Sequence, residues 1–466
     1  MYDLTIIGSG PGGYVAAIRG AQSGMKVMLV EKDALGGTCL NRGCIPTKSL
    51  VHDTRLLHAA RFSDVLTGSG ALAVDPARLL ARKRQMVGKL VGGLGALMKG
   101  NDIEVVRGLG ELIGPGRVAV RPEGGGIMEV AARNILLATG SRPAVPPFIM
   151  VDGRRVQTTD EALDAEEIPG EVVIIGGGVI GIEMATIYLN LGCRVVILEM
   201  LEDILVTEDR EVRVLMRRLL KQQGVRLHLL ARVQAVTAEE GGVVVRFQGA
   251  GDPAEKLSVD RVLVATGRTP VFSGIDAKGL GLAMEGPFVK VNSRMETSLP
   301  GVWAVGDLVG GMMLAHKASA EAETAVACMI GSNQGNHMRP IPRCIWGPTE
   351  IGAVGLTEDE ARGAGRKVRV GKFDFQASGA AQAMGHGIGF AKVVGDSDTG
   401  EILGVHIVGE HATDLVGLAV AVMTMEGVVE DIARAIMPHP TLSEAIMEAA
   451  LDWNGLAVHG PKKQGR

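Results

Sequence analysis

The chain has few cysteines, no long apolar run and no excess of positive charge, and each absence excludes a class of protein. Five cysteines among 466 residues are too few for the disulfide framework of a small extracellular domain. No run of about 18 apolar residues is free of charged residues or glycine, so we expect no membrane span and no membrane partner. The formal net charge is −4, which gives no electrostatic reason to expect a nucleic-acid partner.

The N-terminus lacks a basic segment followed by an apolar segment, which excludes a typical signal peptide and predicts a cytoplasmic location. Residues 4–7 instead look like a β-strand. The length allows roughly three domains of about 150 residues each. Glycine is abundant, at 66 residues, without the period of collagen or the runs of a linker, and this abundance indicates many tight turns.

One supersecondary unit occurs twice in the chain. In the first copy, a strand at 4–7 leads into Gly8, Gly10 and Gly13, and after a helix the next strand ends at Glu31. The corresponding residues of the second copy are Gly176, Gly178, Gly181 and Glu199. The first glycines of the two copies are 168 positions apart, and so are the two acids. A single glycine-rich turn is a weak signal, but two complete units at one offset predict two dinucleotide-binding sites.

Each part of the unit has a physical role in binding a dinucleotide. The first glycine makes a tight turn, the second lets the backbone approach a pyrophosphate, and the third lets the helix pack on the strand. The helix N-terminus offers unpaired N–H groups to the phosphates, and the acid accepts a hydrogen bond from a ribose hydroxyl. Two sites in one chain suggest a permanently bound flavin and an exchanging nicotinamide. Because a carboxylate repels the 2′-phosphate of NADP, Glu199 favours NAD.

A second, weaker repeat relates residues 135–140 to residues 262–267, where two strand-like runs each end in Thr-Gly. These runs indicate that the chain leaves a nucleotide-binding domain near residues 143 and 270. We therefore expect an α/β fold with two Rossmann-like dinucleotide-binding domains. The C-terminal segment has no nucleotide motif and its apolar helices suit a dimer interface, so we expect a C-terminal α+β dimerisation domain there. The expected segments are 1–143 for the first part of the FAD domain, 144–270 for the NAD domain, 271–338 for the second part of the FAD domain and 339–466 for the dimerisation domain.

Cys39 and Cys44 form a close pair of cysteines. In a regular helix their Cα atoms would be about 8–9 Å apart, beyond the limit of about 7 Å for a disulfide. Bridging therefore requires a distorted turn, which Gly43 and Pro46 permit. A helix that begins near Ile45 would place its positive end at the pair and lower the thiol pKa values. A zinc site needs four ligands, and no second Cys or His pair lies nearby at ligand spacing, so we expect no metal.

Residues 36–48, which carry this pair, resemble the active-disulfide signature of the flavin-dependent pyridine nucleotide–disulfide oxidoreductases. The similarity extends to both nucleotide units and to residues 305–307, 313–318 and 439–444. Within that family these segments look most like the dihydrolipoamide dehydrogenases. The resemblance implies FAD and NAD as cofactors and a homodimer that oxidises dihydrolipoamide with NAD⁺. It also implies a partner, the lipoyl-bearing carrier domain of a 2-oxo acid dehydrogenase or glycine cleavage complex.

The resemblance also implies roles for individual positions. Cys39 would exchange with the substrate, and Cys44 would face the flavin. The expected catalytic residues are the two redox cysteines, a proton-transferring histidine with its acid, and a lysine–glutamate pair at the flavin: Cys39, Cys44, His439, Glu444, Lys48 and Glu183. The expected FAD contacts are Gly8, Gly10, Gly13, Glu31, Lys32, Gly37, Thr38, Lys48, Gly110, Thr139, Gly140, Ser141, Asp307, Met313, Leu314, Ala315 and His316. The expected NAD contacts are Gly176, Gly178, Val179, Ile180, Gly181, Glu183, Glu199, Val233 and Gly267.

Two departures from the family pattern leave alternatives open. Met437 and Pro438 stand where related dehydrogenases often have His-Ala, and Arg42 stands where a small apolar residue is common. Both could change the substrate mouth. The alternative is a related disulfide reductase that acts on glutathione, coenzyme A or metal substrates. An inactive FAD-binding scaffold would be expected to lose a redox cysteine, Lys48 or His439, and the chain retains all of them.

Overall fold

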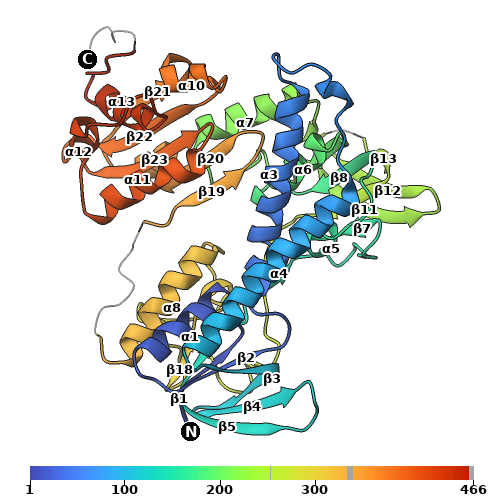
Figure 1. The fold of residues 1–466 in the computed structure, drawn as a ribbon, viewed down its shortest axis with the longest axis vertical. Helices are drawn as coiled ribbons and strands as arrows, with labels where there is room; N and C mark the ends of the chain where they lie inside the picture. The colour runs from blue at the N-terminus through green and yellow to red at the C-terminus, as the bar shows by residue number, and fades with distance from the viewer. Residues whose placement is uncertain (252, 333–339, 461–466) are drawn as a thin grey trace. The chain divides into compact units, whose positions relative to one another are not determined.

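The computed structural model describes residues 1–251, 253–332 and 340–460 (Figure 1). The chain forms two compact units. Unit 1 consists of Met1–Ile168 and Thr266–Met338, and unit 2 consists of Pro169–Ala265 and Arg339–Arg466. The expected α/β class is confirmed. The expected four-segment division stays a prediction, and its boundary at 338/339 lies outside the described residues. Among the described helices, none is long and apolar enough to cross a membrane.

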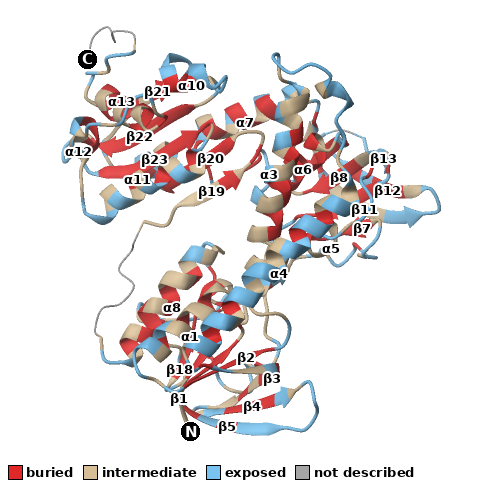
Figure 2. Cartoon of the chain, in the orientation of Figure 1, coloured by how far each residue is buried: buried red, intermediate tan, exposed pale blue. Residues whose placement is uncertain are grey.

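A six-stranded sheet forms the centre of unit 1. Its strands are β1 (Tyr2–Ile7), β2 (Val27–Glu31), β3 (Glu104–Gly114), β4 (Arg117–Pro122), β5 (Met128–Leu137) and β18 (Val302–Ala304). β1 pairs in parallel with β2 and β5, whereas β4 pairs antiparallel with β3 and β5. Parallel strands that are buried on both faces carry continuous apolar runs. This explains why residues 4–7 and 27–30 contain no charged residue, and the central strands are coloured as buried in Figure 2.

Side chains of β1 alternate between the two faces of this sheet. Leu4 and Ile6 pack in the core beneath α1 (Pro11–Gln22) and α8 (Ala315–Met329), and Ile7 packs in a separate core on the other face. The helices α1 and α8 contact each other, so they cover the same face (Figure 1). Further elements of unit 1 are α2 (Gly37–Arg42), α3 (Cys44–Arg61), η1 (Ser69–Ala71), α4 (Pro76–Gly100), β6 (Ser141–Pro143), β7 (Val156–Gln157), α5 (Thr159–Ala162), β15 (Arg268–Pro270), β16 (Met284–Glu285), β17 (Phe288–Val289) and η2 (Gly306–Val309).

Unit 2 contains a parallel sheet that repeats the strand–helix–strand arrangement of unit 1. Its parallel strands, in spatial order, are β10 (Arg226–His228), β9 (Arg194–Leu198), β8 (Glu171–Ile175) and β14 (Arg261–Val264). The helix between β8 and β9 is α6 (Val179–Asn190), and α7 (Arg210–Gln222) follows β9. An antiparallel group lies in the sequence between β10 and β14: β11 (Arg232–Glu239), β12 (Gly242–Gln248) and β13 (Glu255–Val259).

The C-terminal part of unit 2 is an antiparallel sheet with helices packed on it. The strands, in spatial order, are β19 (Arg343–Trp346), β20 (Glu350–Gly355), β23 (Ile402–Val408), β22 (Phe390–Asp396) and β21 (Val368–Asp374). The helices are α9 (Glu358–Gly363), α10 (Gly379–Ala383), α11 (Ala412–Thr424), α12 (Val429–Arg434) and α13 (Glu444–Trp453), with the short η3 (Phe375–Ala377). Val393 and Val405 share one apolar core with Val416 of α11 and Ala449 of α13.

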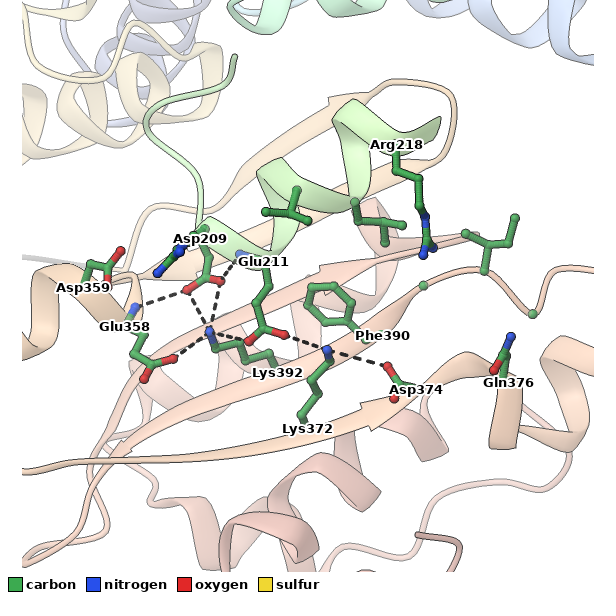
Figure 3. Close-up of a pocket in the computed structure, with 16 residues that line it drawn as sticks. Asp209, Glu211, Arg218, Glu358, Asp359, Lys372, Asp374, Gln376, Phe390 and Lys392 are labelled. Carbon is green, nitrogen blue, oxygen red and sulfur yellow. Dashed lines mark hydrogen bonds and ion pairs between the residues drawn. The ribbon is translucent and has the colours of Figure 1, made fainter. Parts of the chain in front are cut away.

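The opposite face of this sheet carries buried charge. Lys392 and His406 are cross-strand partners on β22 and β23, and both are buried. The Lys392 Nζ atom lies 3.0 Å from Asp209 Oδ1, 2.9 Å from Glu211 Oε1 and 2.8 Å from Glu358 Oε2 (Figure 3). Burial opposes the charge of Lys392, but hydrogen bonds to Glu358 and Glu211 and the nearby Asp209 raise its pKa overall. The cluster therefore joins the start of α7 to the C-terminal sheet.

A cavity of about 640 Å³ opens beside this cluster (Figure 3). Lys372 stands over the ring of Phe390 in its wall, with the Nζ atom 4.4 Å from the ring centroid. The same ammonium group lies 2.6 Å from Glu211 Oε2. The charged side chains that line the cavity therefore pair largely with one another. None of the residues expected to be catalytic, all of which the structure describes, lines this cavity.

Replacing Lys392 with methionine should lower the free energy of unfolding by about 3 kcal/mol, because a fully buried Asp209 would lose its cation. The measurement is urea unfolding of the purified variant followed by circular dichroism. The matched control is Lys367→Met, which removes an exposed pair with Asp398 and should cost less than about 1 kcal/mol. Equal losses for the two variants would contradict the structural role of Lys392.

Candidate active site

The first glycine turn leaves open space in front of a helix end. Gly8 has φ +100°, a backbone conformation that glycine adopts readily. A Cβ atom on Gly13 would overlap the carbonyl oxygen of Gly8, so the helix can approach the strand only without a side chain there. Gly10 is the N-cap of α1, and a Cβ built on it would meet no atom within 4 Å. The N-terminus of α1 is therefore accessible to a phosphate group.

The second turn repeats this geometry. Gly176 has φ +113°, and a Cβ atom on Gly181 would overlap the Gly176 carbonyl oxygen. Gly178 is the N-cap of α6, and again nothing lies within 4 Å of its Cβ position. Both turns thus combine a tight crossing of helix and strand with open space at the helix end. These are the features that a bound pyrophosphate requires, so both turns fit a dinucleotide.

In each turn, the acid at the end of the second strand accepts hydrogen bonds from two backbone N–H groups. Glu31 Oε2 accepts a hydrogen bond from Ser9 N at 2.8 Å, and its Oε1 accepts one from Asp33 N at 2.8 Å. Glu199 makes the same two hydrogen bonds, at 2.6 and 2.7 Å, to the backbone N–H groups 168 positions after Ser9 and Asp33. The sequence repeat is therefore also a repeat of hydrogen bonds.

The redox segment, residues 36–48, begins in contact with the first glycine turn, and its helix is interrupted where expected. A Cβ atom on Gly37 would lie 2.7 Å from the Cα atom of Gly10, so the segment packs directly on the glycine turn. The helix α2 ends at Arg42, and Gly43, with φ −138° and ψ −110°, interrupts the chain before α3 begins at Cys44. The predicted distortion at Gly43 is confirmed. It lets the Cys39 and Cys44 side chains meet, as thiols that share a hydrogen bond.

The prediction of lowered thiol pKa values is wrong for Cys39. The hydrogen bond to Cys44 and burial both raise the pKa of the Cys39 thiol, and the positive charge of Lys48 only partly offsets them. Cys39 lies inside α2, whereas Cys44 is the first residue of α3. Lys48, one turn into α3, is nevertheless close enough to stabilise a thiolate at the pair.

Tyr14 is a neighbour of the cysteine pair that sequence reasoning missed. Burial raises the pKa of its hydroxyl, and the nearby Cys39 and Cys44 raise it further. Tyr14 immediately follows Gly13 on α1. Its position directly after the glycine motif was the available signal, because the first turn of that helix faces the site.

A polar network lies where the sheet of unit 1 ends. The Ser141 hydroxyl donates to Asp307 Oδ2, and Arg268 donates to Ser141 Oγ at 2.6 Å and to Ser141 O at 2.9 Å. Arg268 Nε also lies 3.8 Å from Asp307 Oδ2. Asp307 is near enough to Cys39 to raise the pKa of that thiol. Ser141 and Asp307 were expected, whereas Arg268 was missed because its partners are distant in sequence.

The structure divides the remaining expected contacts between the units. The expected FAD contacts all lie in unit 1, including Lys32, Thr38, Gly110, Thr139, Gly140, Met313, Leu314, Ala315 and His316. Of the expected NAD contacts, Gly176, Gly178, Val179, Ile180, Gly181, Glu183, Glu199 and Val233 lie in unit 2, whereas Gly267 lies in unit 1. Glu183 Oε1 accepts a hydrogen bond from Trp346 N at 3.2 Å. Its expected pairing with Lys48, a residue of unit 1, stays a prediction.

His439 and Glu444 are brought together at the start of α13. His439 Nδ1 lies 2.9 Å from Glu444 Oε1, and Glu444 Oε2 accepts a hydrogen bond from Thr441 N at 2.9 Å. The Thr441 N–H and then His439 lower the pKa of the Glu444 carboxyl. The His439 side chain is 76% exposed, so its Nε2 atom is accessible. The pair can therefore accept a proton at Nε2 while Glu444 stabilises the cation.

A second histidine–glutamate pair lies one helical turn away. His459 Nδ1 lies 2.7 Å from Glu448 Oε1, and Glu448 is buried on the same helix as Glu444. The charge of His459 contributes to lowering the pKa of Glu444. Sequence reasoning missed this pair because its members are separated by the helix end and a reversal of the chain.

Comparison with known proteins agrees with this geometry. Residues 2–322 match the family model for pyridine nucleotide-disulphide oxidoreductases, and residues 341–450 match the model for the dimerisation domain of that family. A dihydrolipoyl dehydrogenase of Bacillus subtilis (strain 168) is 39% identical over 471 residues, covering 98% of this chain and 99% of the relative. That of Thermus scotoductus is 40% identical over 461 residues, covering 98% of each.

Solved structures are similar over almost the whole chain. LpdA from Mycobacterium tuberculosis superposes with a TM-score of 0.89 at 26% identity, covering 96% of this chain and 98% of that one. A Cu(II) complex of the HOCl-induced flavoprotein disulfide reductase RclA from Escherichia coli gives 0.86 at 27% identity, with the same coverage. The chain therefore belongs to the family of pyridine nucleotide-disulphide oxidoreductases, enzymes whose cofactors are FAD and NAD.

Proposed function

We propose that this enzyme is a dihydrolipoyl dehydrogenase that oxidises protein-bound dihydrolipoamide to lipoamide and reduces NAD⁺. The observation that carries the proposal is the hydrogen bond between His439 Nδ1 and Glu444 Oε1, in a chain that also holds a pair of thiols. The His439–Glu444 pair can remove protons from thiol substrates. A reductase of metal ions does not need such a base. The full-length similarity to dihydrolipoyl dehydrogenases supports the same substrate.

The proposed reaction is an exchange between substrate thiols and the Cys39–Cys44 disulfide. A substrate thiolate attacks the Cys39 sulfur and forms a mixed disulfide, and Cys44 leaves as the thiolate. The second substrate thiol then displaces Cys39 and closes the cyclic disulfide of lipoamide. FAD, when bound, supplies the electron path from the cysteine pair to NAD⁺. The positive charge of Lys48 stabilises the thiolates that form at the pair.

His439 is the proposed base for the substrate thiols. If its Nδ1–H donates to Glu444, the lone pair lies on the exposed Nε2 atom, which is the tautomer that a base needs. The hydrogen bond from Thr441 N keeps Glu444 ionised, because it lowers the pKa of that carboxyl. An ionised Glu444 favours the imidazolium that forms when the proton arrives.

The two glycine turns are proposed to hold different cofactors. The turn of unit 1 is assigned to FAD, because the redox segment packs on it at Gly37. The turn of unit 2 is assigned to NAD, with Glu199 at the adenine ribose. The expected contacts named above, including Lys32, Gly110 and Val233, belong to this assignment.

The match of residues 341–450 to a dimerisation domain supports a homodimer. We infer that His439 acts on the disulfide of the partner subunit and that the substrate is carried by the lipoyl domain of a 2-oxo acid dehydrogenase or glycine cleavage complex. A cytoplasmic location belongs to the same proposal.

The substrate is tested by assaying NADH-dependent reduction of lipoamide, glutathione disulfide and coenzyme A disulfide side by side. Lipoamide should have the highest kcat/KM, and His439→Gln should lower it roughly 10²–10⁴-fold, the usual contribution of a general base. The control is His386→Gln, which replaces another partly exposed histidine of the C-terminal segment and should change kcat/KM by less than about twofold. A higher kcat/KM for glutathione disulfide or coenzyme A disulfide would reject the proposed substrate.

The arrangement of the dimer is tested with mixed dimers of a Cys44→Ser chain and a His439→Ala chain. If each site combines the disulfide of one chain with the histidine of the other, one of the two sites is intact and about half of the wild-type activity returns. The measurement is lipoamide turnover by tagged, purified heterodimers, with each homodimeric variant as a control. No recovery, with both homodimers inactive, would place the complete site within one chain.

A further inference from the structure

Arg42 lies between the two redox cysteines in sequence, yet its side chain is engaged elsewhere. It is the last residue of α2, and its Nη2 atom forms an ion pair with Asp33 Oδ2. The side chains of Arg42 and Asp33 are 45% and 50% exposed, so the pair lies at the surface of unit 1. The Arg42 side chain therefore contacts the segment that contains Asp33, which suggests a role other than shaping the substrate mouth.

Asp33 belongs to the loop that follows the acid of the first nucleotide unit. Its backbone N–H donates to Glu31 Oε1 at 2.8 Å, and its carbonyl oxygen accepts from Arg107 Nη2 at 3.4 Å. Glu31 in turn accepts from Ser9 N in the glycine turn. Arg42 is thus connected through Asp33 to the residue proposed to bind the FAD ribose.

A second acid, Asp160, lies close enough to Arg42 for the charge of Arg42 to affect it. Burial raises the pKa of Asp160, and the positive charges of Arg42 and Arg268 oppose that rise. The Oδ1 atom of Asp160 is buried and has no hydrogen-bond partner among the described residues. Arg268 donates to Ser141, whose hydroxyl donates to Asp307. The charge of Arg42 therefore acts on Asp160 as well as on Asp33.

We propose that Arg42 is a positioning residue for FAD. By pairing with Asp33, Arg42 holds the redox segment against the loop of Glu31 and so strengthens the binding of the cofactor. A small apolar residue at this position cannot form the pair. The inference depends on FAD, the cofactor of the family, and not on dihydrolipoamide as the substrate.

The test is the affinity of the apoprotein for FAD, measured by the change of flavin fluorescence on binding. Arg42→Val and Asp33→Asn should each raise the Kd for FAD about fivefold, which corresponds to about 1 kcal/mol. The Kd for FAD of the double variant should be about the same as that of either single variant, because both changes remove the same ion pair. Arg42→Lys, which keeps the charge, should restore most of the affinity.

The matched control is Arg82→Gln, which removes the ion pair between Arg82 Nε and Asp53 Oδ2, 2.8 Å long, from the same unit. It should leave the Kd for FAD unchanged within about twofold, since neither Arg82 nor Asp53 is among the expected FAD contacts. An unchanged Kd in Arg42→Val, or an equal rise in Arg82→Gln, would overturn the proposal. The assay contains no disulfide substrate, so its outcome is separate from the test of lipoamide turnover.

Discussion

A carboxylate that binds two backbone N–H groups holds each glycine turn in the shape that a dinucleotide requires. Glu31 and Glu199 each bind one N–H group inside the turn and one just beyond their own strand. This bridge joins the end of the second strand to the start of the helix, and it orders a segment rich in glycine, which has much conformational freedom to lose. The same carboxylate is the group that a ribose hydroxyl would bind. The shape of the turn and the choice of nucleotide therefore depend on one side chain.

The redox chemistry of unit 1 is built on the first of these turns. Gly37 packs on Gly10, which places the start of the redox segment against the glycine turn. The break at Gly43 then lets the two cysteines meet, and Lys48 lies near them. Burial and the hydrogen bond within the pair stabilise the protonated thiol of Cys39. A thiolate at this site therefore depends on the positive charge of Lys48. The proposed base, His439, acts on the substrate thiols instead.

The sequence was sufficient for features that repeat or that depend on local geometry. The offset of 168 predicted two turns that also share their hydrogen bonds, and the spacing of Cys39 and Cys44 predicted the break at Gly43. It was insufficient wherever burial or a distant partner decides the outcome. Lys392 looks like a surface lysine in a strand, and its three acidic partners come from other segments. The pKa of Cys39 and the partner of Arg42 depend on tertiary contacts in the same way.

The assignment of different cofactors to two turns of one design can be tested by the rate at which reduced nicotinamides bleach the bound flavin in anaerobic stopped-flow. NADH should act with at least about a tenfold higher second-order rate constant than NADPH, because a like-charge contact and a lost hydrogen bond at Glu199 together exceed ~1.4 kcal/mol. Glu199→Gln should reduce this preference without loss of FAD. Equal rate constants for NADH and NADPH in the wild-type enzyme would contradict the assignment of the second turn.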